Sequence, residues 1–120
     1  MSSSNDWFGT PDEAQLSIDV FREEKELVVR SLVAGVKPQD LDISVHGDLL
    51  TIRGKREEEQ ETSSKESFYR ECYWGSFSRS VVLPNEVSSD NAKASLKNGI
   101  LELRFPIVEG GKRLKVTWEE

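Results

Sequence analysis

The feature that most constrains this chain is an alternation of apolar and polar residues at every second position, repeated in separate segments. This period places one row of side chains on each face of a β-strand, so that one face can be buried while the other stays in water. No window of twelve residues shows a convincing apolar repeat of the helical period, so the chain is expected to be all-β. Strands are predicted near residues 16–20, 27–32, 41–46, 50–52, 77–83, 92–96 and 101–105.

Two dipeptides predict tight reversals between neighbouring strands. Asn98-Gly99 is the strongest two-residue hairpin signal, because both residue types tolerate the positive φ that such a turn requires. Gly47-Asp48 predicts a second reversal for the same reason. Pro84 cannot donate to a sheet ladder and should end the strand before it. These turns join about seven to eight short strands, which favours an immunoglobulin-like antiparallel β-sandwich, with a partly closed barrel as the structural alternative.

Length and charge limit the partners of such a sandwich. The 120 residues correspond to one domain, and a net charge of −6 weighs against binding to nucleic acid or to an anionic membrane surface. No apolar stretch is long enough to span a bilayer, and Met1–Asp6 has no secretion signature. The single cysteine, Cys72, cannot form an internal disulfide, which fits a reducing compartment. We therefore expect a cytoplasmic protein.

Catalytic and cofactor chemistry have few candidate residues. The chain has one histidine, His46, and one cysteine, so it cannot supply a multi-histidine or Cys/His metal site. A Ser-His-Asp arrangement would have to use His46, whose position before Gly47 favours a solvent-facing turn histidine. Gly110-Gly111 lacks the Gly-Lys-Ser/Thr ending of a phosphate-binding loop. No enzyme activity, metal or cofactor is expected.

A long polar segment interrupts the strand pattern in the middle of the chain. Gly54–Ser67 contains no apolar residue, whereas Phe68–Trp74 is dense in aromatic side chains with high β-propensity and ends at Gly75. A polar arm that carries an aromatic strand is expected where protomers exchange strands, so a protruding strand-exchange loop is predicted. A hairpin that packs on its own subunit is the alternative that these residues leave open.

The C-terminal segment resumes the alternation after a tether. Gly110-Gly111 predicts a flexible connection to Leu114–Trp118, where every second residue is apolar. This segment either closes the sheet of its own domain or docks in a groove of another subunit. Docking would place Leu114 and Val116 between the strand that holds Ile43 and Val45 and the strand that holds Ala94 and Leu96.

Four stretches of the chain resemble the small heat-shock proteins, whose shared part is the alpha-crystallin domain, over about residues 16–116. All four occur in the family's order with suitable spacing, which makes the match specific. Leu32–Leu41 is similar to the family's Leu-Pro-Gly-Val turn and strand, with Ala34 where proline is usual. Leu49–Gly54 resembles its Leu-Thr-Ile-x-Gly strand, Gly75–Pro84 its Gly-x-Phe-x-Arg-x-x-x-Leu-Pro strand, and Ala94–Leu101 its Ala-x-x-x-x-Gly-Val-Leu hallmark, with Ile100 for valine.

The resemblance implies a sandwich that dimerises and acts as an ATP-independent holdase, often within larger oligomers. Its partners would be unfolding client proteins and further copies of itself. The strand on the arm would be exchanged between protomers, and Leu114-x-Val116 would correspond to the family's C-terminal Ile-x-Ile/Val motif. Arg79 would either cover apolar surface with its stem or contact a charge across the dimer, such as Glu71. The implied dimer-interface residues are Phe68, Tyr69, Arg70, Glu71, Tyr73 and Arg79.

The chain also departs from the family pattern. The segment before the first strand is shorter than is usual in the family, and Trp7 and Phe8 are its large apolar side chains and the candidate client contacts. Cys72 stands where arginine is common. A non-chaperone interaction module, like the CS-type sandwich of co-chaperones that recognises folded partners, is the alternative function. The expected boundaries are a short N-terminal segment at 1–15, a sandwich domain at 16–106 and a C-terminal extension at 107–120.

Overall fold

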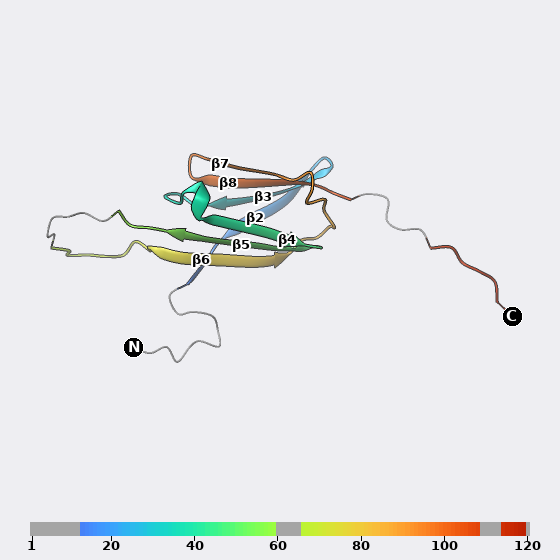
Figure 1. Ribbon diagram of the computed structural model, residues 1–120, viewed down its shortest axis with the longest axis horizontal. Coiled ribbons are helices and arrows are strands. Elements are labelled where there is room, and N and C mark those ends of the chain that lie inside the picture. Colours follow the sequence, from blue (N-terminus) through green and yellow to red (C-terminus); the bar gives the residue numbers. More distant parts are fainter. Residues whose placement is uncertain (1–12, 60–65, 109–113, 120) are drawn as a thin grey trace.

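Two four-stranded sheets packed face to face make up the computed structural model, which describes residues 13–59, 66–108 and 114–119 (Figure 1). One short 3-10 turn, η1 (Pro38–Asp40), precedes the fourth strand. The expected all-β sandwich is confirmed, and the partly closed barrel does not form. The strands in chain order are β1 (Ala14–Gln15), β2 (Ile18–Glu23), β3 (Glu26–Leu32), β4 (Leu41–His46), β5 (Leu49–Arg56), β6 (Gly75–Val82), β7 (Lys93–Lys97) and β8 (Ile100–Pro106).

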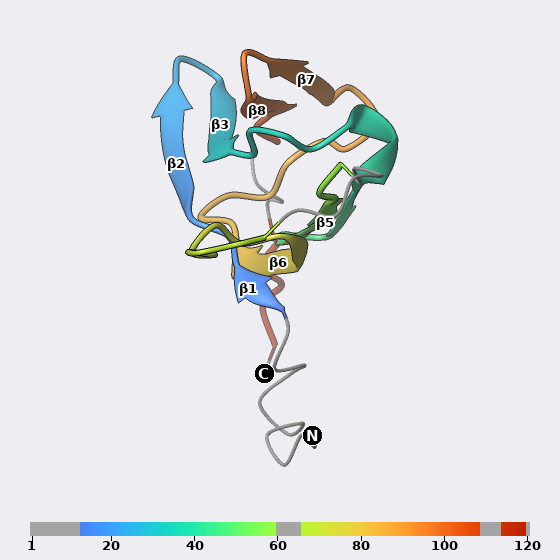
Figure 2. The same cartoon turned by 90° about the vertical axis from the view of Figure 1, so that its left-hand side faces the viewer.

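The strand order leaves open edges on both sheets. One sheet has the order β1-β6-β5-β4 and the other has the order β2-β3-β8-β7. Figure 2 shows the two layers from one end, with β2, β3, β8 and β7 above β6 and β1. All neighbours are antiparallel except β1 and β6, which run parallel. Strands β2, β4 and β7 therefore each have one edge without a partner strand in the described part of this chain.

The core lies between the sheets and follows the alternation in the sequence. Most inward-facing positions of β3, β5 and β8 are buried, because most of these alternate residues are apolar and pack against the opposite sheet. Burial of each such side chain contributes on the order of 1.5–3 kcal/mol. Val28 is also buried although it faces outward, and the strand register places it between Phe21 and Arg104. The inward core includes Leu27, Val29, Leu50, Ile52, Phe77, Leu101, Leu103 and Phe105.

The predicted hairpin turns are confirmed. Asn98 and Gly99 both have positive φ, at 53° and 79°, and they join β7 to β8 as a two-residue turn. Gly47 has a φ of 66° in the two-residue turn between β4 and β5. A third two-residue turn, Glu24-Lys25 between β2 and β3, was not predicted, because neither residue type signals a reversal. There Glu24 itself takes a positive φ of 57°.

The polar arm begins later than the sequence predicts. Gly54 to Arg56 continue β5 and pair with Phe77 to Gly75 of β6, so the arm begins at Glu57 rather than at Gly54. Gly54 pairs with Phe77 in the sheet, and the Phe77 ring packs directly over it. A Cβ atom added to Gly54 would lie 2.5 Å from Phe77 Cζ and 3.1 Å from a methyl group of Leu41. Glycine occupies position 54 because another side chain packs closely against the backbone there. It does not indicate a loop.

Pairing also extends slightly past the expected ends of the sandwich domain. Ala14 and Gln15 pair with Phe77 and Ser78, and Leu16 donates its N–H to the Ser78 carbonyl. Leu16 then leaves this sheet, and the first predicted strand starts at Ile18 in the other sheet. At the C-terminal end, Ile107 forms an isolated bridge with Val87.

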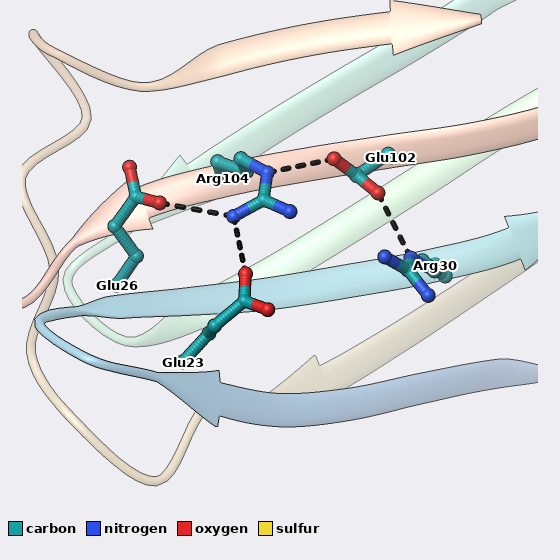
Figure 3. A network of polar contacts seen from close by, with 5 residues as sticks. All are labelled: Glu23, Glu26, Arg30, Glu102 and Arg104. Atoms are coloured by element: carbon teal, nitrogen blue, oxygen red, sulfur yellow. Dashed lines mark hydrogen bonds and ion pairs between the residues drawn. The ribbon is translucent and has the colours of Figure 1, made fainter. Parts of the chain in front are cut away.

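A network of charged side chains covers the outer face of the second sheet (Figure 3). Arg104 contacts Glu23 at 2.8 Å, Glu26 at 3.0 Å and Glu102 at 2.7 Å, and Glu102 also accepts a hydrogen bond from Arg30 at 2.8 Å. The hydrogen bond from Arg104, followed by that from Arg30, holds the pKa of Glu102 below its ordinary value. Single exposed ion pairs stabilise little, but this network links β2, β3 and β8 at one place.

The packing of Phe77 on Gly54 predicts a steric effect that can be measured. Gly54→Ala should lower the free energy of unfolding by about 1–3 kcal/mol, because the new methyl group must displace the ring or the strand. In a Phe77→Leu background the same substitution should cost less, since the smaller side chain leaves room. Urea denaturation of the four chains of this cycle measures the coupling. Equal costs of Gly54→Ala in both backgrounds would show that the close approach does not constrain the sheet.

Candidate functional site

The arm between β5 and β6 exposes a group of aromatic side chains to solvent. Its described limbs are Glu57–Glu59 and Glu66–Trp74, which project beyond the ends of β5 and β6 (Figure 1). Phe68 and Tyr69 are 80% and 86% exposed, so these aromatic side chains do not pack on their own subunit. No residue of 66–74 belongs to a strand of this chain. Exposed apolar side chains grouped on a surface are typical of interaction sites.

A salt bridge ties the two limbs of the arm to each other. Arg70 Nη2 lies 2.7 Å from Glu58 Oε1, and a second, longer hydrogen bond of 3.4 Å joins Arg70 Nη1 to the other carboxylate oxygen. The hydrogen bond to Glu58, together with the nearby negative charge, raises the pKa of Arg70. Within one subunit Arg70 therefore has a partner on the opposite limb. Glu71 and Cys72, its neighbours on the chain, are exposed.

Arg56 joins the root of the arm to the sandwich, a role that the sequence reasoning missed. Its Nε donates to the Ala34 carbonyl at 2.7 Å, and its Nη1 donates to the Tyr73 carbonyl at 3.4 Å. Its guanidinium lies 5.8 Å from the centroid of the Phe77 ring. The alternating period of the strand could have revealed this inward position, because Arg56 continues the inward-facing row that includes Ile52.

Arg79 lies between the sheets, on the inward-facing row of β6. Its Nη1 donates to the Leu16 carbonyl at 3.0 Å, at the point where the chain crosses from β1 to β2. Among the residues that the structure describes, Arg79 has no carboxylate partner. A contact of Arg79 with Glu71 across a dimer stays a prediction, and Glu71 is exposed on the arm.

A groove of about 220 Å³ lies where the edge strands β4 and β7 face each other. Ile43 and Val45 form one wall and Ala94 belongs to the other. Leu96 does not line the groove. It pairs with Leu101 and packs against the core, whereas the small alanines leave the adjacent space open. The remaining lining residues are Ser89, Ala92, Lys93, Leu103 and Phe105.

The C-terminal segment does not close a sheet of its own subunit. Residues 114–119 form no strand, and Leu114 and Val116 are 82% and 90% exposed. Trp118, two residues further along, is equally accessible. These three apolar residues alternate with polar ones, so an extended conformation of the segment would place all three on one side.

The other candidate residues form no further site. His46 is exposed beside its turn, and the described residues contain no group of three His, Cys, Asp or Glu arranged to hold a metal ion. The candidate client contacts Trp7 and Phe8 lie outside the described residues. In the part of the chain that the structure covers, no helix has the length and apolar character needed to cross a membrane.

A two-sheet sandwich with a projecting arm and a groove between edge strands is the architecture of an alpha-crystallin domain. The chain belongs to the Hsp20/alpha crystallin family, which matches residues 19–117. Small heat shock protein C2 of Rickettsia felis is 40% identical over 82 residues, covering 68% of this chain and 53% of that protein. Spore protein SP21 of Stigmatella aurantiaca is 35% identical over 107 residues, covering 87% of this chain and 63% of that protein.

The fold is similar to solved structures of the same family. Heat shock protein 16.0 from Schizosaccharomyces pombe superposes with a TM-score of 0.74 at 29% sequence identity, covering 90% of this chain and 100% of that one. The chain spans between about half and two-thirds of the length of the two curated relatives described above. The family resemblance predicted from the sequence is confirmed.

Proposed function

We propose that this chain is an ATP-independent molecular chaperone, a holdase that binds partially unfolded proteins and prevents their aggregation. The observation that carries the proposal is the apolar groove beside the edge strands β4 and β7, on a domain of the Hsp20/alpha crystallin family. Partially unfolded proteins expose apolar segments, and unpaired strand edges with neighbouring apolar side chains are suited to receive such segments. Binding of this kind needs no nucleotide, cofactor or catalytic group.

The proposed client surface is broad and shallow. The groove between β4 and β7 offers apolar walls beside two unpaired strand edges. Trp7 and Phe8 would add aromatic contacts from the N-terminal segment. The proposed location is the cytoplasm, since a single exposed cysteine fits a reducing compartment.

We further propose that two copies of the chain exchange their arms. The described residues 66–74 belong to no strand of their own subunit, and within the described part of the chain no strand pairs with the outer edge of β2. Pairing the two would satisfy backbone donors and acceptors and would bury aromatic side chains that one subunit leaves in water. The proposed interface consists of Phe68, Tyr69, Arg70, Glu71, Tyr73 and Arg79.

The C-terminal segment is proposed to dock in the groove of another subunit. Leu114 and Val116 lie two residues apart, about 7 Å in an extended chain, which is the spacing of Ile43 and Val45 along one groove wall. Full burial would give roughly 1.5–3 kcal/mol per side chain, but ordering of the tether offsets several kcal/mol. A single segment should therefore bind weakly, and larger assemblies would depend on many such contacts acting together.

Chaperone activity is tested by light scattering of a model client that is unfolded by heat or by a reductant. Substoichiometric to equimolar amounts of the protein should suppress the scattering with no nucleotide added, because capture needs only exposed apolar surface. A folded acidic protein of similar size serves as the control. If the client aggregates unchanged at several-fold molar excess of the folded protein, the chain is instead an interaction module for folded partners.

Arm exchange is tested by replacing Glu57–Glu66 with a two-residue linker. The shortened chain should fold but sediment as a monomer at low micromolar concentration, because Phe68–Tyr73 can no longer reach a partner. Replacement of the same ten residues by a Gly/Ser linker of equal length is the matched control and should keep the dimer, since it keeps the reach. A shortened chain that still sediments as a dimer would show that the arm is only a surface loop.

Tail docking is tested by the double substitution Leu114→Gly and Val116→Gly. Any oligomer larger than a dimer should shift to dimers with little loss of thermal stability, because both side chains are exposed within their own subunit. Lys115→Gly with Thr117→Gly is the matched control, since it changes the backbone equally but keeps the anchors. The reciprocal change Ala94→Leu should have the same effect as removal of the anchors by filling the groove. An unchanged size for the anchor double variant contradicts docking.

A further inference from the structure

Arg56 occupies an unusual position at the boundary between the sheet and the arm. It is the last residue of β5 and pairs with Gly75, the first residue of β6. The side chain is half-buried on the inward-facing row, where most other positions carry apolar groups or glycine. A guanidinium in such a place requires hydrogen-bond acceptors, since its desolvation is costly without them.

The acceptors of Arg56 come from two separate parts of the chain. The Ala34 carbonyl, 2.7 Å from Nε, belongs to the loop after β3. The Tyr73 carbonyl, 3.4 Å from Nη1, belongs to the returning limb of the arm. The Tyr73 hydroxyl in turn donates to the Ser76 carbonyl, which closes this limb on the start of β6. Arg56 thus connects the arm to the loop that follows β3 of the other sheet.

The hydrogen bonds of Arg56 lie at the base of a long projecting arm. Phe68 lies seven residues before Gly75, about 23 Å along an extended chain, so a small rotation at the root displaces the aromatic side chains widely. The Arg70–Glu58 salt bridge holds the two limbs together, but neither residue belongs to a strand of the sandwich. The direction in which the arm leaves the sandwich therefore depends on contacts at the root.

We infer that Arg56 is a positioning residue that holds the arm in the direction from which a second copy of this chain can receive Phe68–Tyr73. The inference rests on the arm exchange proposed above. An arm held in place loses less conformational freedom on pairing than an arm that swings, so Arg56 strengthens the dimer without belonging to its interface. Arg56 acts through the backbone of Ala34 and Tyr73, which accept its hydrogen bonds.

The dimer dissociation constant is the first measurement. Arg56→Gln should raise the Kd about tenfold, which corresponds to about 1.4 kcal/mol. Arg56→Lys should have an intermediate effect, since it keeps the charge but loses the planar fork and the stacking on Phe77. Lys55→Gln is the matched control, because it removes a neighbouring exposed cation, which pairs with Glu57 at 3.2 Å, and leaves the hydrogen bonds of Arg56 to the Ala34 and Tyr73 carbonyls in place. It should change the Kd less than threefold, as expected for an exposed ion pair.

The mobility of the arm is the second measurement, and it distinguishes positioning from simple stabilisation of the fold. Cys72 is the only cysteine and is exposed, so a spin label attached there reports on the arm alone. Diluted below the Kd, Arg56→Gln should increase the motion of the label, whereas Lys55→Gln should leave it unchanged. A substitution that only destabilised the sandwich would lower the unfolding midpoint without changing this motion in the folded chain.

The two measurements distinguish failure of the inference from failure of the proposed arm exchange. Unchanged label motion in Arg56→Gln overturns the inference, and so does an unchanged Kd in a chain whose dimer depends on the arm. A chain that dimerises after arm shortening contradicts the proposed exchange instead. In that case the label motion still decides whether Arg56 holds the arm.

Discussion

Burial of one row of side chains from each strand between the two sheets is the constraint on which the rest of the structure depends. Only alternate residues can enter the core. The opposite row of side chains, the strand edges and the connecting segments must therefore make their interactions outside it. On the outer face of one sheet, charged side chains form an ion network centred on Arg104. The arm and the C-terminal segment have no such arrangement in the described part of the chain and keep their apolar side chains exposed.

The exposed parts have complementary features elsewhere on the same molecule. The arm carries exposed aromatic side chains outside the strands, and β2 has an edge with no partner strand among the described residues. The C-terminal segment carries apolar anchors, and the groove between β4 and β7 is lined by apolar side chains. Under the proposed arm exchange and tail docking, association between copies would bring each segment to the site proposed to receive it. Self-assembly and capture of unfolded segments would then use the same exposed surface.

Charged side chains mainly hold exposed segments in position and contribute less to the stability of the core. Arg79 and Arg56 both occupy inward-facing positions of the first sheet, and each donates to a backbone carbonyl of a distant segment. Their hydrogen bonds place the β1–β2 crossover and the root of the arm. Arg70 adds a contact between the limbs. The acceptors of Arg56 and Arg79 are main-chain atoms, so side-chain patterns alone do not reveal these contacts.

The sequence by itself determined the all-β class, the strands, the Asn98-Gly99 turn and the polar arm with its aromatic end. These features are local, because strand period and turn conformation depend on neighbouring residues. The extension of β5 through Gly54, the pairing of β1 with β6 and the absence of Leu96 from the groove were decided only by the tertiary structure. So were the hydrogen bonds of Arg56 to Ala34 and of Arg79 to Leu16, which join residues 22 and 63 positions apart. Such contacts depend on which strands become neighbours and how closely they pack, and both follow from burial of the whole core.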